Sequence, residues 1–341
     1  MNWLLDSFWW LLAVKMLIIA AVVPGLALVA IYGELKISAH MQSRIGPYFA
    51  GGRFGWAQPL ADGVKFIQKE DLVPEDADPF VFKLAPYVVL GGTIATFVIV
   101  PFGPDLAVRD LDLGLFYVLA VSSLSTLGVL MAGWASGNKY SLTGGLRAAA
   151  QLIAYELPLV LAAVGVAIQA GTLSLQEIVG VQATSISVFG LFDAELPFVL
   201  TGQIIGFGIF ITASLAELTR IPFDMPIAES ELVMGYLTEY SGLRFTMFFL
   251  GEYAGMISLA AVASTLFLGG WYLPGIPDSA LDYLGPFILI GKVFVLVFIF
   301  IWMRWTFPRM REDQLQSLAW RWLIPLALAN IGATGFFKVA F

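Results

Sequence analysis

Residues 287–303 read FILIGKVFVLVFIFIWM, an uninterrupted apolar run whose single charged residue is Lys292. A helix that crosses a lipid bilayer needs about 20 consecutive, mostly apolar residues. The run is therefore predicted to be a transmembrane helix, and seven other stretches of the chain have the same character. The eight predicted spans are residues 10–31, 84–100, 115–134, 148–170, 196–216, 245–270, 287–303 and 323–339.

The composition of the whole chain agrees with this interpretation. Of its 341 residues, 59% are hydrophobic and only 13% are charged, whereas a soluble domain carries about 25% charged residues. The chain has no cysteine and one histidine, His40, which excludes disulfides and cysteine-held iron–sulfur clusters and argues against a histidine-built metal site. The net charge of −7 argues against nucleic-acid binding. Without a visible repeat or linker, residues 1–341 are predicted to form one all-α integral membrane domain.

Basic residues are concentrated in alternate loops, and this pattern predicts orientation. The odd-numbered loops hold 14 of the 18 lysines and arginines. Loops rich in Lys and Arg stay on the cytoplasmic side of a membrane. We therefore expect these loops to face the cytoplasm, or its organellar equivalent, and both termini to face the other side. The first span lacks a basic leader and a cleavage site, so it is expected to be retained.

The first cytoplasmic loop, residues 32–83, is too long to be a simple connection. Residues 54–69 have helical periodicity, with Trp56, Leu60, Val64 and Ile67 on one stripe. Such a helix is expected to lie in the membrane interface rather than cross it. It is either a surface anchor or a lip around a lateral opening for a lipid-soluble ligand.

Several carboxylates fall within or next to the predicted spans. Glu156 lies in the fourth span, Glu252 in the sixth, and Glu34 at the cytoplasmic end of the first. Residues 217–239 then hold five acidic residues against one base, Arg220, in an otherwise apolar segment. Ionisable groups at membrane depth are costly and face the bundle interior or polar cavities.

Any one of these carboxylates is explained equally well as a structural hydrogen-bond acceptor. The whole set favours a proton relay, because burial raises the pKa of a carboxyl group towards neutrality. An ion-paired scaffold would need more nearby bases. The last cytoplasmic loop, around Arg304 and Arg311, either orients the chain by its positive charge or docks a soluble partner.

Six segments together carry a resemblance to a known family, in sequence and in order. They are SRIGP (43–47), AQPLADGVKFIQKED (57–71), GNKYSLTGGLRAAAQLIAYELP (137–158), AELTRIPFDMPIAESELVMGYLTEYSG (216–242), FFLGEYAGMI (248–257) and WMRWTFPRMREDQL (302–315). The chain resembles the NADH dehydrogenase subunit 1 family, the quinone-site membrane subunit of respiratory complex I. The resemblance covers residues 34–330.

The resemblance implies a fold and a function. It implies eight transmembrane helices with an interfacial helix in the first loop, and a location in the bacterial inner membrane, with an organellar membrane as the other possibility. The family forms the quinone entrance and tunnel, docks the peripheral arm and couples quinone reduction to proton translocation. Its quinone is a substrate. The iron–sulfur clusters belong to neighbouring subunits, so this chain is expected to bind no cofactor or metal and to have no activity alone.

The resemblance also assigns residues position by position. It places four residues near the quinone path: Arg44, Asp62, Lys65 and Phe223. It places two basic residues, Arg147 and Arg220, among the acids of the proton path. The acids of that path are Glu34, Glu156, Glu217, Asp224, Glu229, Glu231, Glu239 and Glu252.

The chain departs from the family pattern at four positions. Leu35 stands where the family usually has arginine, Tyr48 and Gly255 where it usually has asparagine, and Ile227 where it usually has an acid. The change at residue 227 removes one carboxylate from the expected relay. The electron donor is left open, because related complexes use ferredoxin or a reduced deazaflavin instead of NADH.

Two other functions compete with this interpretation. The equivalent subunit of a membrane-bound hydrogenase has similar sequence segments. A secondary transporter with an acidic coupling site would show inverted repeats and a midplane substrate site. We find no such repeat, and the acids of this chain favour one side of the membrane.

Overall fold

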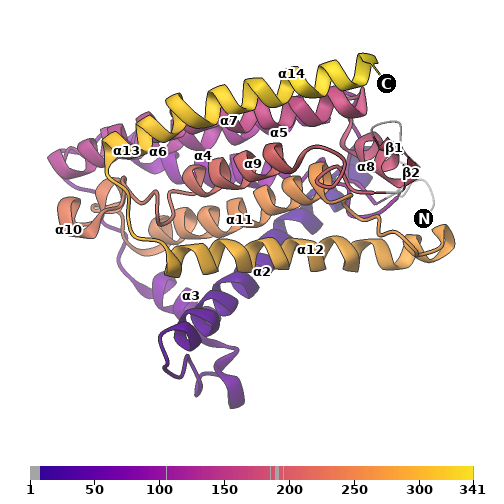
Figure 1. Cartoon of the computed structure of the whole chain (residues 1–341). Helices are drawn as coiled ribbons and strands as arrows, with labels where there is room; N and C mark the ends of the chain where they lie inside the picture. The colour runs from indigo at the N-terminus through magenta and orange to yellow at the C-terminus, as the bar shows by residue number, and fades with distance from the viewer. Residues whose placement is uncertain (1–7, 105, 185, 189–191, 195, 341) are drawn as a thin grey trace.

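A computed structural model describes residues 8–104, 106–184, 186–188, 192–194 and 196–340. Long helices run side by side along one direction, and α2 crosses them obliquely (Figure 1). The α2 helix begins, and α14 ends, at the same end of the bundle (Figure 1). The principal helices are α2 (Phe8–Met41), α4 (Pro79–Thr96), α5 (Gly114–Ser122), α6 (Leu124–Ala135), α7 (Lys139–Ala170), α9 (Ile204–Glu217), α11 (Gly242–Phe267), α12 (Asp278–Thr306) and α14 (Ile324–Ala340).

The shorter elements lie in the connections. The described part of the chain also contains an antiparallel pair of strands, with Ile186 opposite Ala194. The all-helical prediction therefore holds for the bundle and not for this connection. The short elements are η1 (Arg53–Gly55), α3 (Gln58–Gln68), α8 (Leu175–Ala183), β1 (Ile186–Val188), β2 (Phe192–Ala194), α10 (Glu229–Leu232), η2 (Gly235–Leu237), α13 (Glu312–Ser317) and the π-helical turn η3 (Leu318–Leu323).

Seven helices in the described part of the chain are long and apolar enough to cross a membrane. The α5 and α6 helices together form one of them, and α13 to α14 form another. The remaining predicted span, residues 196–216, is the fifth along the chain, and its helix is only the 14-residue α9. Its first residues, from Pro197 to Gln203, form turns instead of helix. The sequence pattern missed this difference because the turn residues are themselves mostly apolar.

Two helices, α7 and α11, form the centre of the bundle. The α7 helix packs against α6, α9 and α14, and α11 packs against α2, α4 and α12. Small residues on α7 permit very close approach, as is typical between membrane helices. A Cβ atom added to Gly144 would lie 2.6 Å from the Cα atom of Gly235 and 2.7 Å from the backbone nitrogen of Tyr236.

This close contact gives a stability prediction. Gly144→Ala is expected to lower the stability of the protein by roughly 1–3 kcal/mol, because the added methyl group would push the loop of Gly235 away from α7. The matched control is Gly208→Ala on α9, where an added Cβ meets nothing within 4 Å. Thermal unfolding in detergent should show a lowered midpoint for the first variant only. Equal midpoints for the two variants would contradict the packing.

Two lysines within the bundle bind backbone carbonyls. Lys292 Nζ on α12 donates to the carbonyls of Leu268, Gly270 and Tyr272, at 2.6, 2.8 and 2.6 Å. These carbonyls follow the end of α11, where a positive charge is favourable. Lys15 Nζ on α2 donates to the carbonyl of Val108 at 2.9 Å, in the connection after α4. We therefore assign both lysines a structural role.

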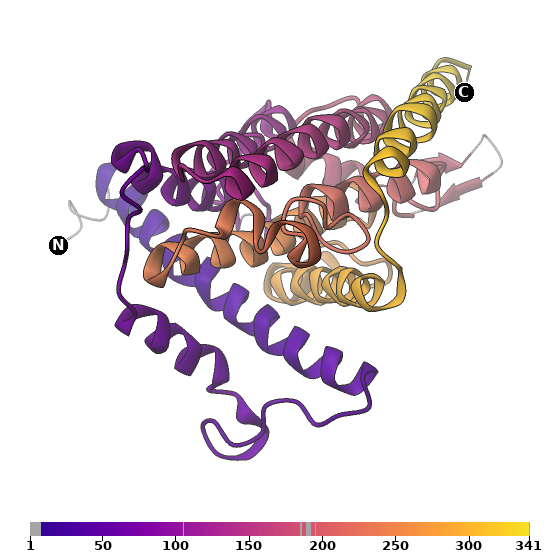
Figure 2. The ribbon, with the colours of Figure 1, turned by 90° about the vertical axis from the view of Figure 1, so that its left-hand side faces the viewer.

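The first long connection begins later than the sequence pattern predicts. The α2 helix continues to Met41, so it includes the first ten residues of the predicted loop 32–83. The connection contains α3 within the range 54–69, and α3 packs on α2 and α11. In Figure 2, α3 and the C-terminal half of α2 lie below the other helices.

Candidate functional site

A buried network of ion pairs joins three helices and the loop that follows α9. Arg220 is 2% exposed, and its Nη1 lies 2.8 Å from Glu34 Oε2 on α2. Its Nε and Nη2 both lie 3.0 Å from Glu252 Oε1 on α11. Arg304, at the end of α12, pairs with the other oxygen of Glu34. Two arginines thus hold two of the predicted relay acids.

Aromatic packing fixes the central arginine. The Arg220 guanidinium lies 4.7 Å from the ring centroid of Tyr253. Arg220 also begins the turn that holds Phe223, because the Phe223 backbone nitrogen donates to the Arg220 carbonyl at 2.7 Å. The network and the turn are therefore a single structural unit at the end of α9.

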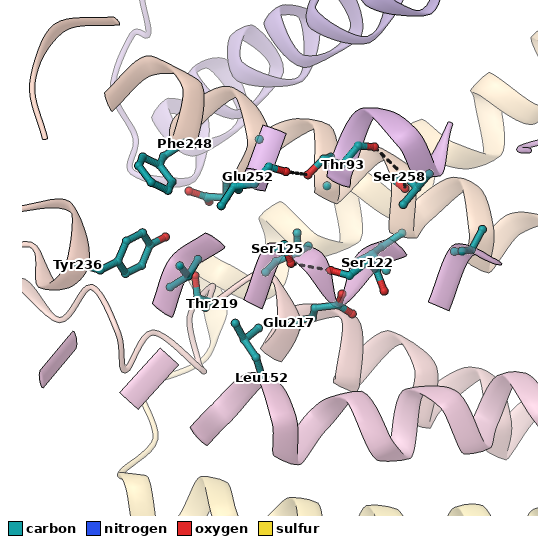
Figure 3. Close-up of a pocket in the computed structure, with 18 residues that line it drawn as sticks. Thr93, Ser122, Ser125, Leu152, Glu217, Thr219, Tyr236, Phe248, Glu252 and Ser258 are labelled. Carbon is teal, nitrogen blue, oxygen red and sulfur yellow. Dashed lines mark hydrogen bonds between the residues drawn. The ribbon is translucent and has the colours of Figure 1, made fainter. Parts of the chain in front are cut away.

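A cavity of about 90 Å³ adjoins this network, and its lining combines apolar side chains with hydroxyl and carboxyl groups. We call it the polar cavity after the latter. Its wall includes both Glu217 and Glu252, and Figure 3 shows hydroxyl side chains between them. The volume has room for about three waters. The hydroxyl-bearing residues that line the cavity are Thr93, Thr96, Ser122, Ser125, Thr219, Tyr236 and Ser258.

Glu217 is the last residue of α9, and one of its carboxylate oxygens is buried. This oxygen, Oε2, has no hydrogen-bond partner among the described residues. Glu156, on α7, is close enough to interact with Glu217 electrostatically. A buried polar atom without a partner is costly, and a water molecule that donates to this oxygen from the adjoining cavity would satisfy it. The structure thus brings Glu156, Glu217 and Glu252 into one region.

Tyr236 connects this cavity to the acidic loop. Burial, and then the carboxylates of Glu252 and Asp224, raise the pKa of Tyr236 above its ordinary value. The phenol therefore keeps its proton and can donate a hydrogen bond. Sequence reasoning missed Tyr236, Tyr253 and Arg304 as members of the site. In the sequence, only the position of Tyr236 inside the acidic segment 217–239 indicated that it could belong to the site.

Other acids of that segment lie nearer the surface. Glu231 is paired by Arg147 Nη1 at 2.7 Å and by Arg309 Nη2 at 3.4 Å. The hydrogen bond from Arg147 and the charge of Arg309 lower the pKa of Glu231, so this carboxylate stays ionised at neutral pH. Glu239 accepts a hydrogen bond from Asn138. The side chain of Glu229 lies outside the described residues.

The four predicted quinone-path residues do not form one cluster. Arg44 bonds Gln42 at 2.7 Å just beyond the exposed end of α2, and on α3 Gln58 donates to Asp62 at 3.2 Å. Lys65, also on α3, lies 5.7 Å from the Phe66 ring centroid. Phe223 is buried, 5.2 Å from the Tyr155 ring. Arg44, Asp62 and Lys65 thus lie along the first connection, whereas Phe223 packs in the core.

Two of the departures from the family pattern have structural counterparts. Ile227 packs against an apolar cluster that includes Tyr236, so an aliphatic contact replaces the expected carboxylate. Gly255 lines the polar cavity, where a Cβ would lie 3.5 Å from Leu218. The absence of a side chain here leaves room in the cavity.

Comparison with known proteins decides the family. The family model for NADH dehydrogenase matches residues 14–335. The chain belongs to the NADH dehydrogenase family. It is 44% identical over 337 residues to the H-type subunit of the NADH-quinone oxidoreductase of Bacillus cytotoxicus, covering 98% of this chain and 96% of that relative. It is 45% identical over 344 residues to an H-type subunit from Syntrophobacter fumaroxidans, covering 98% and 97%.

A third relative, the H-type subunit from Bacillus mycoides, is 44% identical over 326 residues, which cover 94% of this chain and 91% of that protein. The similarity therefore includes the helices, the acidic loop and the long first connection. Together with the seven apolar helices, it makes this chain a multi-pass membrane protein of the NADH dehydrogenase family.

Proposed function

We propose that this chain is the membrane subunit of a complex I-type proton-pumping oxidoreductase that forms the quinone entrance and tunnel. The observation that carries the proposal is the placement of Glu217 and Glu252 on one polar cavity, with Glu252 held by Arg220. A chain of acids from a loop into the bundle is suited to a proton path. Turnover requires the whole assembly, because neighbouring subunits supply the iron–sulfur clusters.

The quinone is proposed to enter beside α3. Leu60, Val64 and Ile67 are all more than half exposed on this helix, and an exposed apolar row suits a helix at the membrane surface. Phe66 on the same helix packs against Phe245 at the start of α11. This contact attaches the proposed entrance to the helix that carries Glu252.

The membrane arrangement is proposed as eight crossings, with α9 as the short one and both termini on the non-cytoplasmic side. The basic residues support this orientation, because Arg147, Arg244 and Arg304 lie near helix ends at one side of the bundle. The peripheral arm is proposed to dock on this face, which also carries the Arg147–Glu231–Arg309 cluster. The acidic loop and the basic residues would thus lie together on the face where the peripheral arm docks.

The partners of the purified protein test this assignment. Affinity purification of the tagged chain from its native membrane, followed by mass spectrometry, should recover iron–sulfur subunits and a peripheral NADH or ferredoxin module. It should recover further multi-pass membrane subunits as well. Recovery of a nickel-site subunit would support the membrane-bound hydrogenase alternative instead, and purification of the chain alone would contradict an assembly of either kind.

A further inference from the structure

The third membrane span carries three serines near its middle, Ser122, Ser123 and Ser125. The α5 helix ends at Ser122 and α6 begins at Leu124, within a stretch that is otherwise one apolar span. Each serine hydroxyl donates back to a carbonyl of its own segment. The bonds are Ser122 to Leu119 at 3.0 Å, Ser123 to Ala120 at 2.9 Å and Ser125 to Ser122 at 2.8 Å.

Two of these serines face the polar cavity. Ser122 and Ser125 line it, whereas Ser123, which lies between them in sequence, does not. In Figure 3, Ser122 lies beside Glu217, and both residues line the cavity. Ser122 and Ser125, three positions apart on this span, therefore place hydroxyl groups between this acid and the rest of the cavity.

The opposite wall of the cavity continues the row of hydroxyls. Thr96 and Ser258 are hydrogen-bonded to each other through their side chains at 2.5 Å, and Thr93 lies one turn from Thr96 on α4. Ser258 is on α11, the helix that holds Glu252. Hydroxyl groups both donate and accept, so they can order waters across the space between the two acids.

We propose that Ser122 is the hydroxyl that passes protons between the cavity and Glu217, with Ser125 positioning the water that serves it. This inference rests on the proposed function, because it gives a route to the same proton path. In the step, a protonated water gives its proton to Ser122 Oγ as the original Ser122 proton moves to the Glu217 carboxylate. The water and the serine end neutral, and the carboxylate becomes a carboxylic acid.

The competing explanation is that the hydroxyls only satisfy backbone carbonyls of their own segment. Ser and Thr commonly form such bonds inside helices. Ser123 provides a matched control, because it has the same back-bond as Ser122 and does not line the cavity. A purely structural role predicts similar effects at the two positions, whereas proton transfer predicts an effect at Ser122 alone.

The test compares Ser122→Ala, Ser122→Thr, Ser123→Ala and Glu217→Gln in the complete complex reconstituted in liposomes. The readouts are the rate of quinone reduction, the number of protons moved per electron, and the infrared carbonyl band of protonated Glu217, identified by its loss in Glu217→Gln. We expect Ser122→Ala to slow coupled turnover roughly tenfold and to shift this band to higher frequency. Ser122→Thr should restore both, and Ser123→Ala should change neither.

Two results would overturn the inference. One is unchanged turnover and an unchanged band in Ser122→Ala, and the other is an equal loss in Ser122→Ala and Ser123→Ala. If Glu217→Gln is impaired while Ser122→Ala is normal, only the role of the serine fails. If Glu217→Gln is itself normal, the proposed proton path fails together with it.

Discussion

Replacing Arg220 with glutamine is expected to prevent stable assembly of this membrane protein. The guanidinium is almost fully buried and pairs with both Glu34 and Glu252. Removing one partner of a buried ion pair leaves an uncompensated charge and costs roughly 3–5 kcal/mol. Here one substitution leaves two carboxylates without their shared partner, and Arg304 is the cation that still neutralises Glu34.

The amount of intact complex on native gels and its thermal midpoint would measure this effect. Arg147→Gln is the matched control for the thermal midpoint alone, because Arg147 lies on the proposed docking face. Its partner Glu231 is about half exposed, and exposed pairs contribute only about 0–1 kcal/mol. Arg220→Lys should recover assembly only partly, since lysine lacks the fork that contacts two acids at once. A normal yield and midpoint for Arg220→Gln would show that the network does not hold these helices together.

Glu217→Gln is expected to lower the rate of quinone reduction by the coupled complex on the order of tenfold or more, while assembly survives. Glutamine has nearly the same shape, and Glu217 Oε2 has no protein hydrogen-bond partner to lose in the described structure. The amide cannot take up and release a proton at neutral pH. Catalysis should therefore suffer far more than stability, which is the reverse of the result expected at Arg220.

The control for this variant is Glu177→Gln on α8. Glu177 is an exposed carboxylate that bonds Thr172 and lies far along the chain from the acidic loop. The Glu177→Gln substitution should leave both assembly and turnover unchanged. Asp224→Asn, in the acidic loop, should resemble Glu217→Gln. If the Glu217 and Asp224 variants both turn over normally, the acids have structural roles only.

Most of the bundle could be predicted from hydrophobic runs, because lipid contact requires nearly every residue of a span to be apolar. The same signal cannot separate a helix from apolar turns, so it predicts a full span over residues 196–216 although α9 begins only at Ile204. It also cannot show where a helix continues beyond the apolar run. The α2 helix extends to Met41 through polar residues such as Glu34 and Lys36.

The acids of the site stand out in the sequence because charge is rare in this chain, but their partners do not. Glu34 and Arg304 are separated by 270 positions, and no local pattern links them. The roles of Lys292 and Lys15 likewise depend on backbone carbonyls from distant segments. Pairing of this kind depends on how the helices cross. The hydrophobic periodicity of a single helix gives no information about that crossing.

The cavity was the least predictable feature. Its polar lining comes from single hydroxyls on several helices, such as Thr93 and Ser258, and each is ordinary in its own segment. The serines at 122, 123 and 125 were the one local signal, since three hydroxyls at the middle of an apolar span are unusual. Only the structure separates Ser123, which does not line the cavity, from its two neighbours.

The most direct test of the proposed coupling measures two rates in sealed liposomes that contain the Glu217→Gln complex: the rate of proton translocation and the rate of quinone reduction. Because Glu217 is proposed to lie on the path that couples the two processes, we expect proton translocation to fall along with the residual electron transfer while the complex remains intact. A variant complex that reduces quinone and pumps protons like the unmodified one would contradict the central claim.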